Sequence, residues 1–312
     1  MKRTATVWIA AGAAVLLVIA GALAWWSLSR PPSAEDAARS YLTALAGGDF
    51  ATIDAMRGND VDEDAERVLM DSFAGADAYA SETRVEEITT GADATTVRAS
   101  AVIAGERREV SFALRDDGGR WELTGDYLAS LEVTVVSAAG TPLGDSAWVG
   151  GALASTARPI LLLPAEYPVR PAPRGLLTGE ASVALSTDEP AAVRINASIA
   201  PDATAAGQAQ LNAYADACTQ PASAVPPDCG LRVPWAADLA TLESIAFRIE
   251  QLPVLAFAPD QRTFAATGGV VVATATGLTS DGGAASFTYR ADDWSLRGTV
   301  TFRGDEMVLA LD

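Results

Sequence analysis

The sequence has 312 residues, of which 49% are hydrophobic, so it is long enough to bury the cores of two or three ordinary domains. Its 40 acidic and 22 basic side chains leave a formal net charge of -18. This balance excludes a typical nucleic-acid-binding protein, because phosphate backbones need Lys and Arg as counter-charges. The chain has no histidine, and its one lysine is Lys2. Imidazole chemistry is therefore excluded, and so are lysine bases and lysine nucleophiles beyond the first few residues.

An uncharged hydrophobic stretch runs from Val7 to Trp26. A helix of this length rises about 1.5 Å per residue and spans about 30 Å, the thickness of the hydrocarbon layer of a bilayer. Lys2 and Arg3 precede the stretch and outnumber Arg30 behind it, which places the N-terminus in the cytoplasm by the positive-inside rule. The sequence therefore predicts a single-pass anchor in the cell membrane, with residues 7–26 in contact with lipid.

A cleaved signal peptide is the alternative for the same segment. Ala22-Leu23-Ala24 matches the A-x-A pattern of a cleavage site, and Trp25 would then begin the mature chain. Both alternatives export the chain beyond about residue 30. We therefore expect the remaining domains to be extracytoplasmic.

The chain has two cysteines, Cys218 and Cys229. Thiols outside the cytoplasm tend to oxidise. Ten residues separate the pair, so it is no C-x-x-C redox motif, and a zinc site would need about four ligands. We predict a structural disulfide, with two free thiols as the alternative. A loop of about 12 residues would contribute about 3 kcal/mol in the chain-entropy model.

Residues 33–128 predict three helices followed by four antiparallel strands. Ser33 and Asp36 form a capping-box pattern at the start of the first helix, and Gly47-Gly48 ends it. The second and third helices are expected over residues 49–56 and 61–73. The four strands are expected over residues 79–91, 95–105, 107–119 and 120–128, with glycine-containing turns between them. Helices followed by a meander of strands indicate an α+β layer.

The same stretch resembles the nuclear transport factor two-like family. The resemblance rests on "YLTALAGGDFATIDAM" and on the closing "DDGGRWEL". It implies a cone-shaped α+β domain, of which extracytoplasmic copies occur in membrane-anchored bacterial envelope proteins, including some penicillin-binding proteins. Many members of the family are scaffold or pocket domains, and some use a pocket Tyr and Asp for proton transfer. Candidates for such a pocket are Tyr41, Tyr79, Asp36 and Asp49, although the spacing of Tyr41 also suits core packing.

The remaining sequence predicts two further domains. Residues 129–188 alternate apolar runs with Gly and Pro turns and predict a small β-sandwich-like domain. Residues 190–312 predict one helix, over residues 202–218, and about five strands, which together indicate a C-terminal α+β domain. The expected order is thus a cytoplasmic tip and anchor (1–30), an α+β domain (33–128), a β domain (129–188) and a second α+β domain (190–312).

An acidic run contains a calcium-loop pattern, with Asp60, Asp62 and Asp64 at alternate positions and Asp71 at position 12. Ala65 stands where the sharp turn of such a loop requires glycine. Aspartate also stands at position 12 in place of glutamate. We therefore interpret the run as the start of a helix capped by Asp60, with its acidic first turn favoured by the helix dipole.

Other candidate catalytic motifs also have simpler interpretations. Ser146 in "GDSAW" resembles a nucleophile motif, but no histidine or external lysine could activate it. The pairs Glu86-Glu87, Asp116-Asp117 and Asp292-Asp293 are adjacent in sequence, and neighbours on a strand point to opposite faces. They are therefore no evidence for the opposed carboxylates of a glycosidase. We predict no catalytic residue, no cofactor and no metal site.

The resulting hypothesis is a non-catalytic binding or scaffold protein of the bacterial cell envelope, with an envelope protein as a possible partner and no nucleic acid. The alternatives are a carboxylate-dependent hydrolase and a carrier of small apolar ligands in a cone-domain pocket. A buried carboxylate facing a large cavity would favour the hydrolase. An empty apolar cavity would favour the carrier, and a filled core would favour the scaffold.

Overall fold

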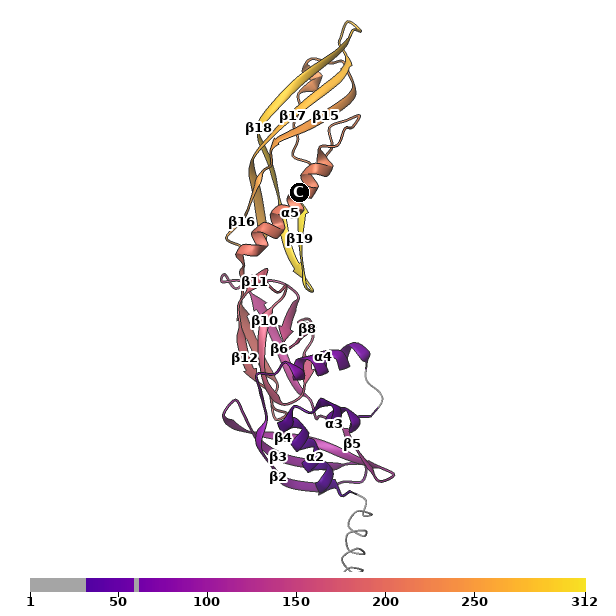
Figure 1. The fold of residues 1–312 in the computed structure, drawn as a ribbon, viewed down its shortest axis with the longest axis vertical. Helices are drawn as coiled ribbons and strands as arrows, with labels where there is room; N and C mark the ends of the chain where they lie inside the picture. Colours follow the sequence, from indigo (N-terminus) through magenta and orange to yellow (C-terminus); the bar gives the residue numbers. More distant parts are fainter. Residues whose placement is uncertain (1–31, 59–61) are drawn as a thin grey trace, which may run out of the picture.

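The computed structural model describes residues 32–58 and 62–312. The chain is elongated, with the N-terminal elements at one end and a C-terminal arm at the other (Figure 1). Strands hold 50% of the residues and helices 19%. The expected α+β class is therefore wrong, and the chain is mostly β. The main reason lies in the arm, where one α-helix of 18 residues accompanies strands of 16 and 20 residues.

No helix within residues 32–58 or 62–312 is long and apolar enough to cross a membrane. The segment expected to do so, residues 7–26, lies outside the described residues, as does the alternative cleavage pattern at residues 22–24.

Three helices come first in the described chain: α2 (Ala34–Gly47), α3 (Phe50–Ala55) and α4 (Glu63–Ala74). The hydroxyl of Ser33 accepts a hydrogen bond from the backbone N–H of Asp36, and the predicted capping box at the start of α2 is confirmed. The helix ends at Gly48, which has a φ of 66°. Asp49 and Asp62 cap the other two helices through their side chains.

The predicted meander follows as a four-stranded antiparallel sheet. Its strands, in the order in which they pair, are β2 (Ser81–Thr90), β3 (Thr95–Ile103), β4 (Glu106–Asp117) and β5 (Arg120–Thr124). Helix α2 packs on this sheet through its apolar positions. The rings of Tyr41 and Phe112, for example, meet edge to face with centroids 4.6 Å apart. The sheet therefore has a filled core beneath the helix.

The middle of the molecule consists of short strands. They are β1 (Ala78–Tyr79), β6 (Ala129–Val136), β7 (Ser146–Val149), β8 (Ala152–Ser155), β9 (Ile160–Leu162), β10 (Ala165–Pro171), β11 (Leu177–Thr178), β12 (Ala181–Ala184), β13 (Ala191–Asn196) and β14 (Ser198–Ile199). One sheet runs β1-β10-β7-β8 with β12 beside β10, a second runs β13-β6-β9, and β11 pairs with β14. Within residues 129–188, every element is a strand.

Two strand pairings cross the boundaries that the sequence predicted between domains. β1 pairs with β10, and α4 packs against β8, β9 and β10, so N-terminal residues join the middle sheets. β13 lies parallel to β6, which brings residues 191–196 beside residues 131–136. One hydrophobic core accordingly extends from α2 through the middle sheets to the base of the arm.

The arm is a long antiparallel sheet around one helix. Its elements are α5 (Pro201–Cys218), the short 3-10 helix η1 (Trp235–Ala237), β15 (Thr241–Gln251), β16 (Val254–Phe257), β17 (Thr263–Leu278), β18 (Ala284–Arg303) and β19 (Glu306–Leu311). The strands pair in the order β15-β17-β18-β19, and β16 pairs with the other half of the β17 edge that β15 uses. Helix α5 packs against β16 and β19. The predicted end of the helix at Cys218 is confirmed.

Candidate functional site

The four residues considered for a proton-transfer pocket do not share one. Tyr41 is fully buried against Phe112, whereas Tyr79 packs on Phe73 with ring centroids 5.0 Å apart. Asp36 belongs to the capping box of α2, and Asp49 accepts hydrogen bonds from Thr52 at the start of α3. Both carboxylates thus serve helix ends, and the two tyrosines serve the core.

Burial raises the pKa of two tyrosines. The pKa of Tyr41 is raised mainly by desolvation and secondly by the neighbouring Tyr127. The Tyr41 hydroxyl lies 3.4 Å from the carbonyl oxygen of Tyr127. The pKa of Tyr167 is also raised, first by burial and then by Tyr41 and Tyr79. Its hydroxyl donates a 2.7 Å hydrogen bond to the carbonyl of Leu163. Both phenols therefore stay neutral, which suits packing and opposes use as a base.

The acidic run forms a helix start. Asp62 accepts hydrogen bonds from the backbone N–H groups of Asp64 and Ala65, while the Asp64 carboxylate pairs with Arg67 at 2.9 Å. The prediction that Asp60 caps this helix is wrong, because the helix begins at Glu63 and Asp62 caps it; Asp60 itself lies outside the described residues. Among residues 32–58 and 62–312, no group of three or more His, Cys, Asp or Glu side chains is arranged to hold a metal ion.

The adjacent carboxylates also have local partners. Glu86 accepts a hydrogen bond from Ser100, and Glu87 pairs with Arg98 at 3.0 Å. Asp116 accepts the backbone N–H of a glycine in the β4–β5 turn, as expected for a hairpin. The buried polar and charged residues of the described chain are Arg57, Ser72, Thr95, Ser137, Ser146 and Ser186. None of these carries a carboxylate.

The serine of "GDSAW" lies at the joint between the middle sheets and the arm. Its hydroxyl donates to Asp145 at 2.9 Å, and the same oxygen of Asp145 accepts the backbone N–H of Gly304 in the β18–β19 turn. Three side chains from the base of the arm belong to the same core as the middle sheets: Val300, Phe302 and Met307. Ser146 is thus a structural residue, and its motif helps to dock the arm.

A second carboxylate completes the joint from the other side. Asp305 accepts a 3.1 Å hydrogen bond from the indole N–H of Trp148 and a 3.0 Å bond from the backbone N–H of Arg174. The guanidinium of Arg174 lies 3.5 Å from the centroid of the Trp148 ring. The arm is therefore attached by a shared core and by two carboxylates bound across the contact.

Two glutamines on α5 cover both edge strands beside the helix. Gln208 accepts the N–H of Leu255 in β16 and donates to the carbonyl just before that strand. Gln210 donates to the carbonyl of Met307 and accepts the N–H of Leu309 in β19. Each side-chain amide thus bonds to backbone groups of an edge strand as a neighbouring strand would. These bonds fix the helix to the sheet on both sides.

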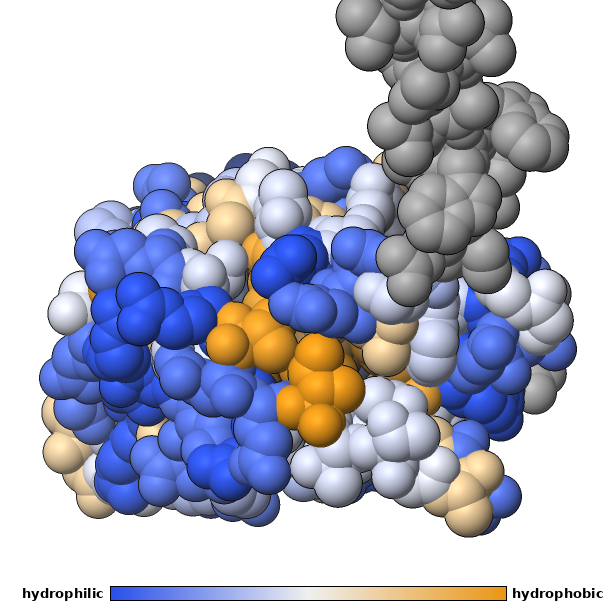
Figure 2. Space-filling view, turned by 90° about the horizontal axis from the view of Figure 1, so that it is seen from below, coloured by the Kyte–Doolittle hydropathy of each residue, from blue (hydrophilic) through white to orange (hydrophobic). Residues whose placement is uncertain are grey.

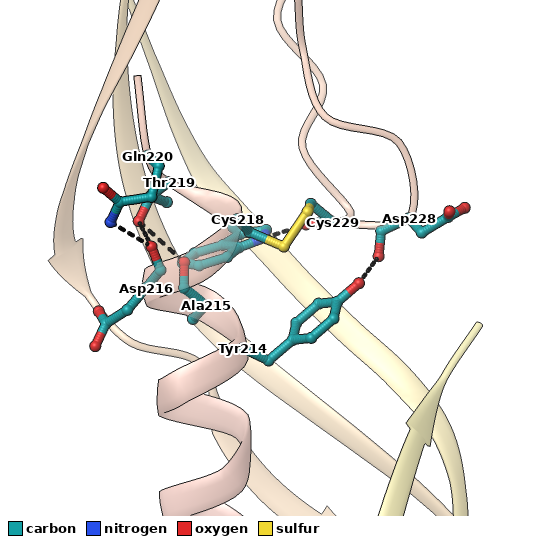
Figure 3. Close-up of a disulfide and its surroundings, with 9 residues drawn as sticks. Tyr214, Ala215, Asp216, Cys218, Thr219, Gln220, Asp228 and Cys229 are labelled. Carbon is teal, nitrogen blue, oxygen red and sulfur yellow. Dashed lines mark hydrogen bonds between the residues drawn. A yellow bond between two sulfur atoms is a disulfide. The ribbon is translucent and has the colours of Figure 1, made fainter. Parts of the chain in front are cut away.

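The two cysteines form the predicted disulfide, which joins the end of α5 to the loop that follows (Figure 3). The Cα atoms are 5.7 Å apart, within the range that a disulfide can bridge. The hydroxyl of Tyr214 donates to the carbonyl of Asp228, and the indole N–H of Trp294 donates to the carbonyl of Cys229. The loop is thereby held against β18.

The sheet of the arm has one buried face and one solvent-exposed face. Along β18, the side chains of residues 285, 287, 289 and 291 lie on the inner side, and those of 286, 288, 290 and 292 are exposed. The exposed face carries an ion network in which Arg248 and Arg290 share Glu250. Val308 is an exposed apolar residue on the same face.

A shallow groove lies at the opposite end of the molecule, between α2 and β2. Its volume is about 600 Å³, and its apolar lining comes from Leu42, Val85 and Ile88. Figure 2 shows hydrophobic residues gathered on this end and bordered by hydrophilic ones. The bordering side chains include the Glu35–Arg39 ion pair. The groove is open to solvent and differs from an enclosed cone-domain pocket.

No protein-family model, curated protein or solved structure matches this chain. The resemblance of residues 33–128 to the nuclear transport factor two-like family therefore stays a proposal.

Sequence reasoning found the capping box of the first helix and the disulfide, but it placed the cap of α4 at Asp60 and missed the joint and the two glutamines. A Trp, an Asp and a Gln carry no local signal for partners that lie 45 to 157 positions away in the sequence. Only the "GDSAW" motif drew attention to the joint, and it did so as a candidate nucleophile.

Proposed function

We propose that this chain is a non-catalytic binding or scaffold protein of the bacterial cell envelope. Residues 7–26 hold it at the cell membrane, and the chain from residue 33 onward lies outside the cytoplasm. The Cys218–Cys229 disulfide supports this location, because disulfides persist in oxidising compartments. The three helices and four-stranded meander of residues 33–128 suit a nuclear transport factor two-like domain that acts as a scaffold.

The observation that carries the proposal is the joint between the middle sheets and the arm, which hydrogen bonds and a shared core hold together. Asp145 and Asp305 bind backbone groups across the contact, and Phe302 lies in the shared core. Helix α2 lies at the far end from the arm (Figure 1), and just before it the indole of Trp121 donates to the carbonyl of Pro32. A chain anchored before this point would therefore hold the exposed face of the arm away from the membrane surface.

The packing of the N-terminal sheet favours a scaffold over the two alternatives. The space under α2 is filled by aromatic and aliphatic side chains, among them Tyr41 and Phe112, and this filled core favours a scaffold over a carrier. A hydrolase that works with carboxylates needs one of them buried to raise its pKa. The buried residues of the described chain include no such group.

Photo-crosslinking in cells tests the proposal. A photoreactive amino acid replaces Thr299 on the exposed face of the arm, and a control carries it at Ala92 in the β2–β3 turn. We expect a discrete crosslinked product from position 299 and none from position 92. Crosslinking from neither position, or the same product from both, would count against a binding role for the arm.

A further inference from the structure

Half of β18 has a strand on one side only. β17 pairs with β18 from Ala284 to Thr299, whereas β19 covers the opposite edge only from Gly298 onward. No backbone hydrogen bond within the described chain joins residues 284–292 to a segment on that opposite edge. In Figure 1 this half of β18 runs along one side of the arm from its tip.

Four other edge strands of the described chain have protective features: β2, β15, β16 and β19. β2 has two register shifts, and Glu82 within it has a φ of 45°, which disrupts a regular ladder. β15 is bridged by Ala222 through two backbone hydrogen bonds with Ile245. β16 and β19 are covered by Gln208 and Gln210.

The open half of β18 lacks these protective features. Residues 284–291 pair with β17 without a register shift, and the stretch contains no proline and no lysine. Its only basic residue, Arg290, is held on the exposed face by Glu250 and Asp292. A regular unpaired edge of this kind is a template for another strand.

The backbone groups that face the open edge can be identified. Arg297 has an exposed side chain, and its backbone carbonyl accepts a hydrogen bond from the N–H of Asp312 on the β19 side. Val300, which has a buried side chain, donates its N–H to Arg262 on the β17 side. Side-chain face and backbone direction alternate together along a strand, so the exposed residues of β18 direct their N–H and C=O groups outward. In the open half these residues are 284, 286, 288, 290 and 292.

We propose that the edge of β18 from Ala284 to Asp292 is a strand-addition site for an extended segment of a partner protein. The segment has an apolar and hydroxyl-bearing centre and basic residues at both ends. This inference rests on the proposed binding role of the arm and names the class of its partner.

Side chains around the edge specify this chemistry. Phe287 and Tyr289 are half-buried on the inner side, where an added strand would cover them with apolar residues. Asp281 stands at the tip end of the edge, and Asp292 and Asp293 stand at the other end, so carboxylates flank it on both sides. Basic residues at the two ends of the added strand would complement these charges.

A peptide-binding experiment on the full-length protein in detergent tests the proposal. The probe is a labelled peptide of alternating Val and Thr with Lys at each end, and its binding is followed by fluorescence anisotropy. A second peptide has Glu at each end. We expect the Lys-ended peptide to bind roughly tenfold more tightly than the Glu-ended peptide.

Two substitutions of Thr288 distinguish the contribution of its backbone N–H to peptide binding from that of its side chain. Thr288→Pro removes an outward N–H and leaves the ladder to β17 in place, because that ladder uses the inner residues. Thr288→Val keeps the N–H. We expect at least roughly tenfold weaker peptide binding for Thr288→Pro and unchanged binding for Thr288→Val.

Hydrogen exchange on the wild-type protein keeps the test decisive if Thr288→Pro fails to fold. The amides of Ser286, Thr288 and Arg290 should exchange rapidly in the free protein and become protected when the peptide binds. Absence of this protection, or equal binding by Thr288→Pro in a folded state, would overturn the proposal. Self-association of the chain that Thr288→Pro abolishes would assign the edge to a second copy instead.

The two proposals can fail separately. If the peptide does not bind and position 299 still crosslinks in cells, the strand-addition site is wrong and the binding role of the arm stands. If both experiments are negative, both proposals are wrong.

Discussion

Asp305 accepts a hydrogen bond from the indole N–H of Trp148, across 157 positions of sequence. The same carboxylate oxygen accepts the backbone N–H of Arg174. This one side chain in the β18–β19 turn therefore bonds to two segments of the middle sheets.

We expect Asp305→Ala to loosen the joint. The substitution leaves the indole and one backbone N–H without their acceptor and should lower the free energy of unfolding by about 1–2 kcal/mol, since both groups are partly solvated. Small-angle scattering should show a broader distribution of overall dimensions. Asp281→Ala in the tip turn is the matched control, because Asp281 bonds only within its own turn. Equal effects of the two substitutions would refute a special role for the joint.

Substitutions of the adjacent glycines Gly47 and Gly48 test which backbone conformation the end of α2 requires. Gly48 has a φ of 66°, and a Cβ there would lie 2.4 Å from the ring of Tyr79, whereas a Cβ at Gly47 meets nothing within 4 Å. Gly48→Ala should therefore destabilise the protein by about 1–3 kcal/mol, from backbone strain and displacement of the Tyr79 ring. Gly47→Ala should be neutral or stabilising by up to about 1 kcal/mol. Thermal unfolding of the two variants measures the difference, and similar melting temperatures would contradict it.

Removal of the disulfide should destabilise the arm. Pro221, Pro226 and Pro227 already restrict the unfolded loop, so the entropic loss should fall somewhat below the flexible-loop value. We expect Cys218→Ser with Cys229→Ser to lower the free energy of unfolding by about 1–3 kcal/mol in urea titrations. Reductant should lower the stability of the wild type and leave the double variant unchanged. A wild type whose stability is insensitive to reductant would argue against a stabilising role of the disulfide.

The buried tyrosines predict a loss of stability in alkali. The pKa values of Tyr41 and Tyr167 are raised in the folded state above the ordinary value of 10.0. Below this value both phenols are neutral in the folded and unfolded chains, and stability is fully present. Above it the unfolded chain releases protons that the folded chain keeps, so stability falls by up to about 1.4 kcal/mol per pH unit for each tyrosine.

Denaturant titrations between pH 7 and 11 check this prediction. Tyr41→Phe should reduce the slope above pH 10 and leave the dependence between pH 7 and 9 unchanged. An unaltered slope above pH 10 would show that Tyr41 ionises in the folded protein.

The sequence alone determined the features that depend on neighbouring residues. The capping box of Ser33 and Asp36 joins groups three positions apart, and Gly48 ends its helix because its backbone adopts a positive φ. The disulfide followed from the absence of any other thiol or histidine. Strands β2 to β5 were predicted because glycine turns and alternating polarity act over a few residues.

Tertiary structure decided the contacts between distant segments. Asp305 meets Trp148, β13 lies parallel to β6, and Gln210 covers the edge of β19, although none of these residues has a local signal for its partner. Such pairings are selected by the burial and hydrogen bonding of the whole chain, which a short window of sequence does not contain. For the same reason the mostly β class emerged only from the assembled strands, and the open edge of β18 became visible only where β19 ends beside it.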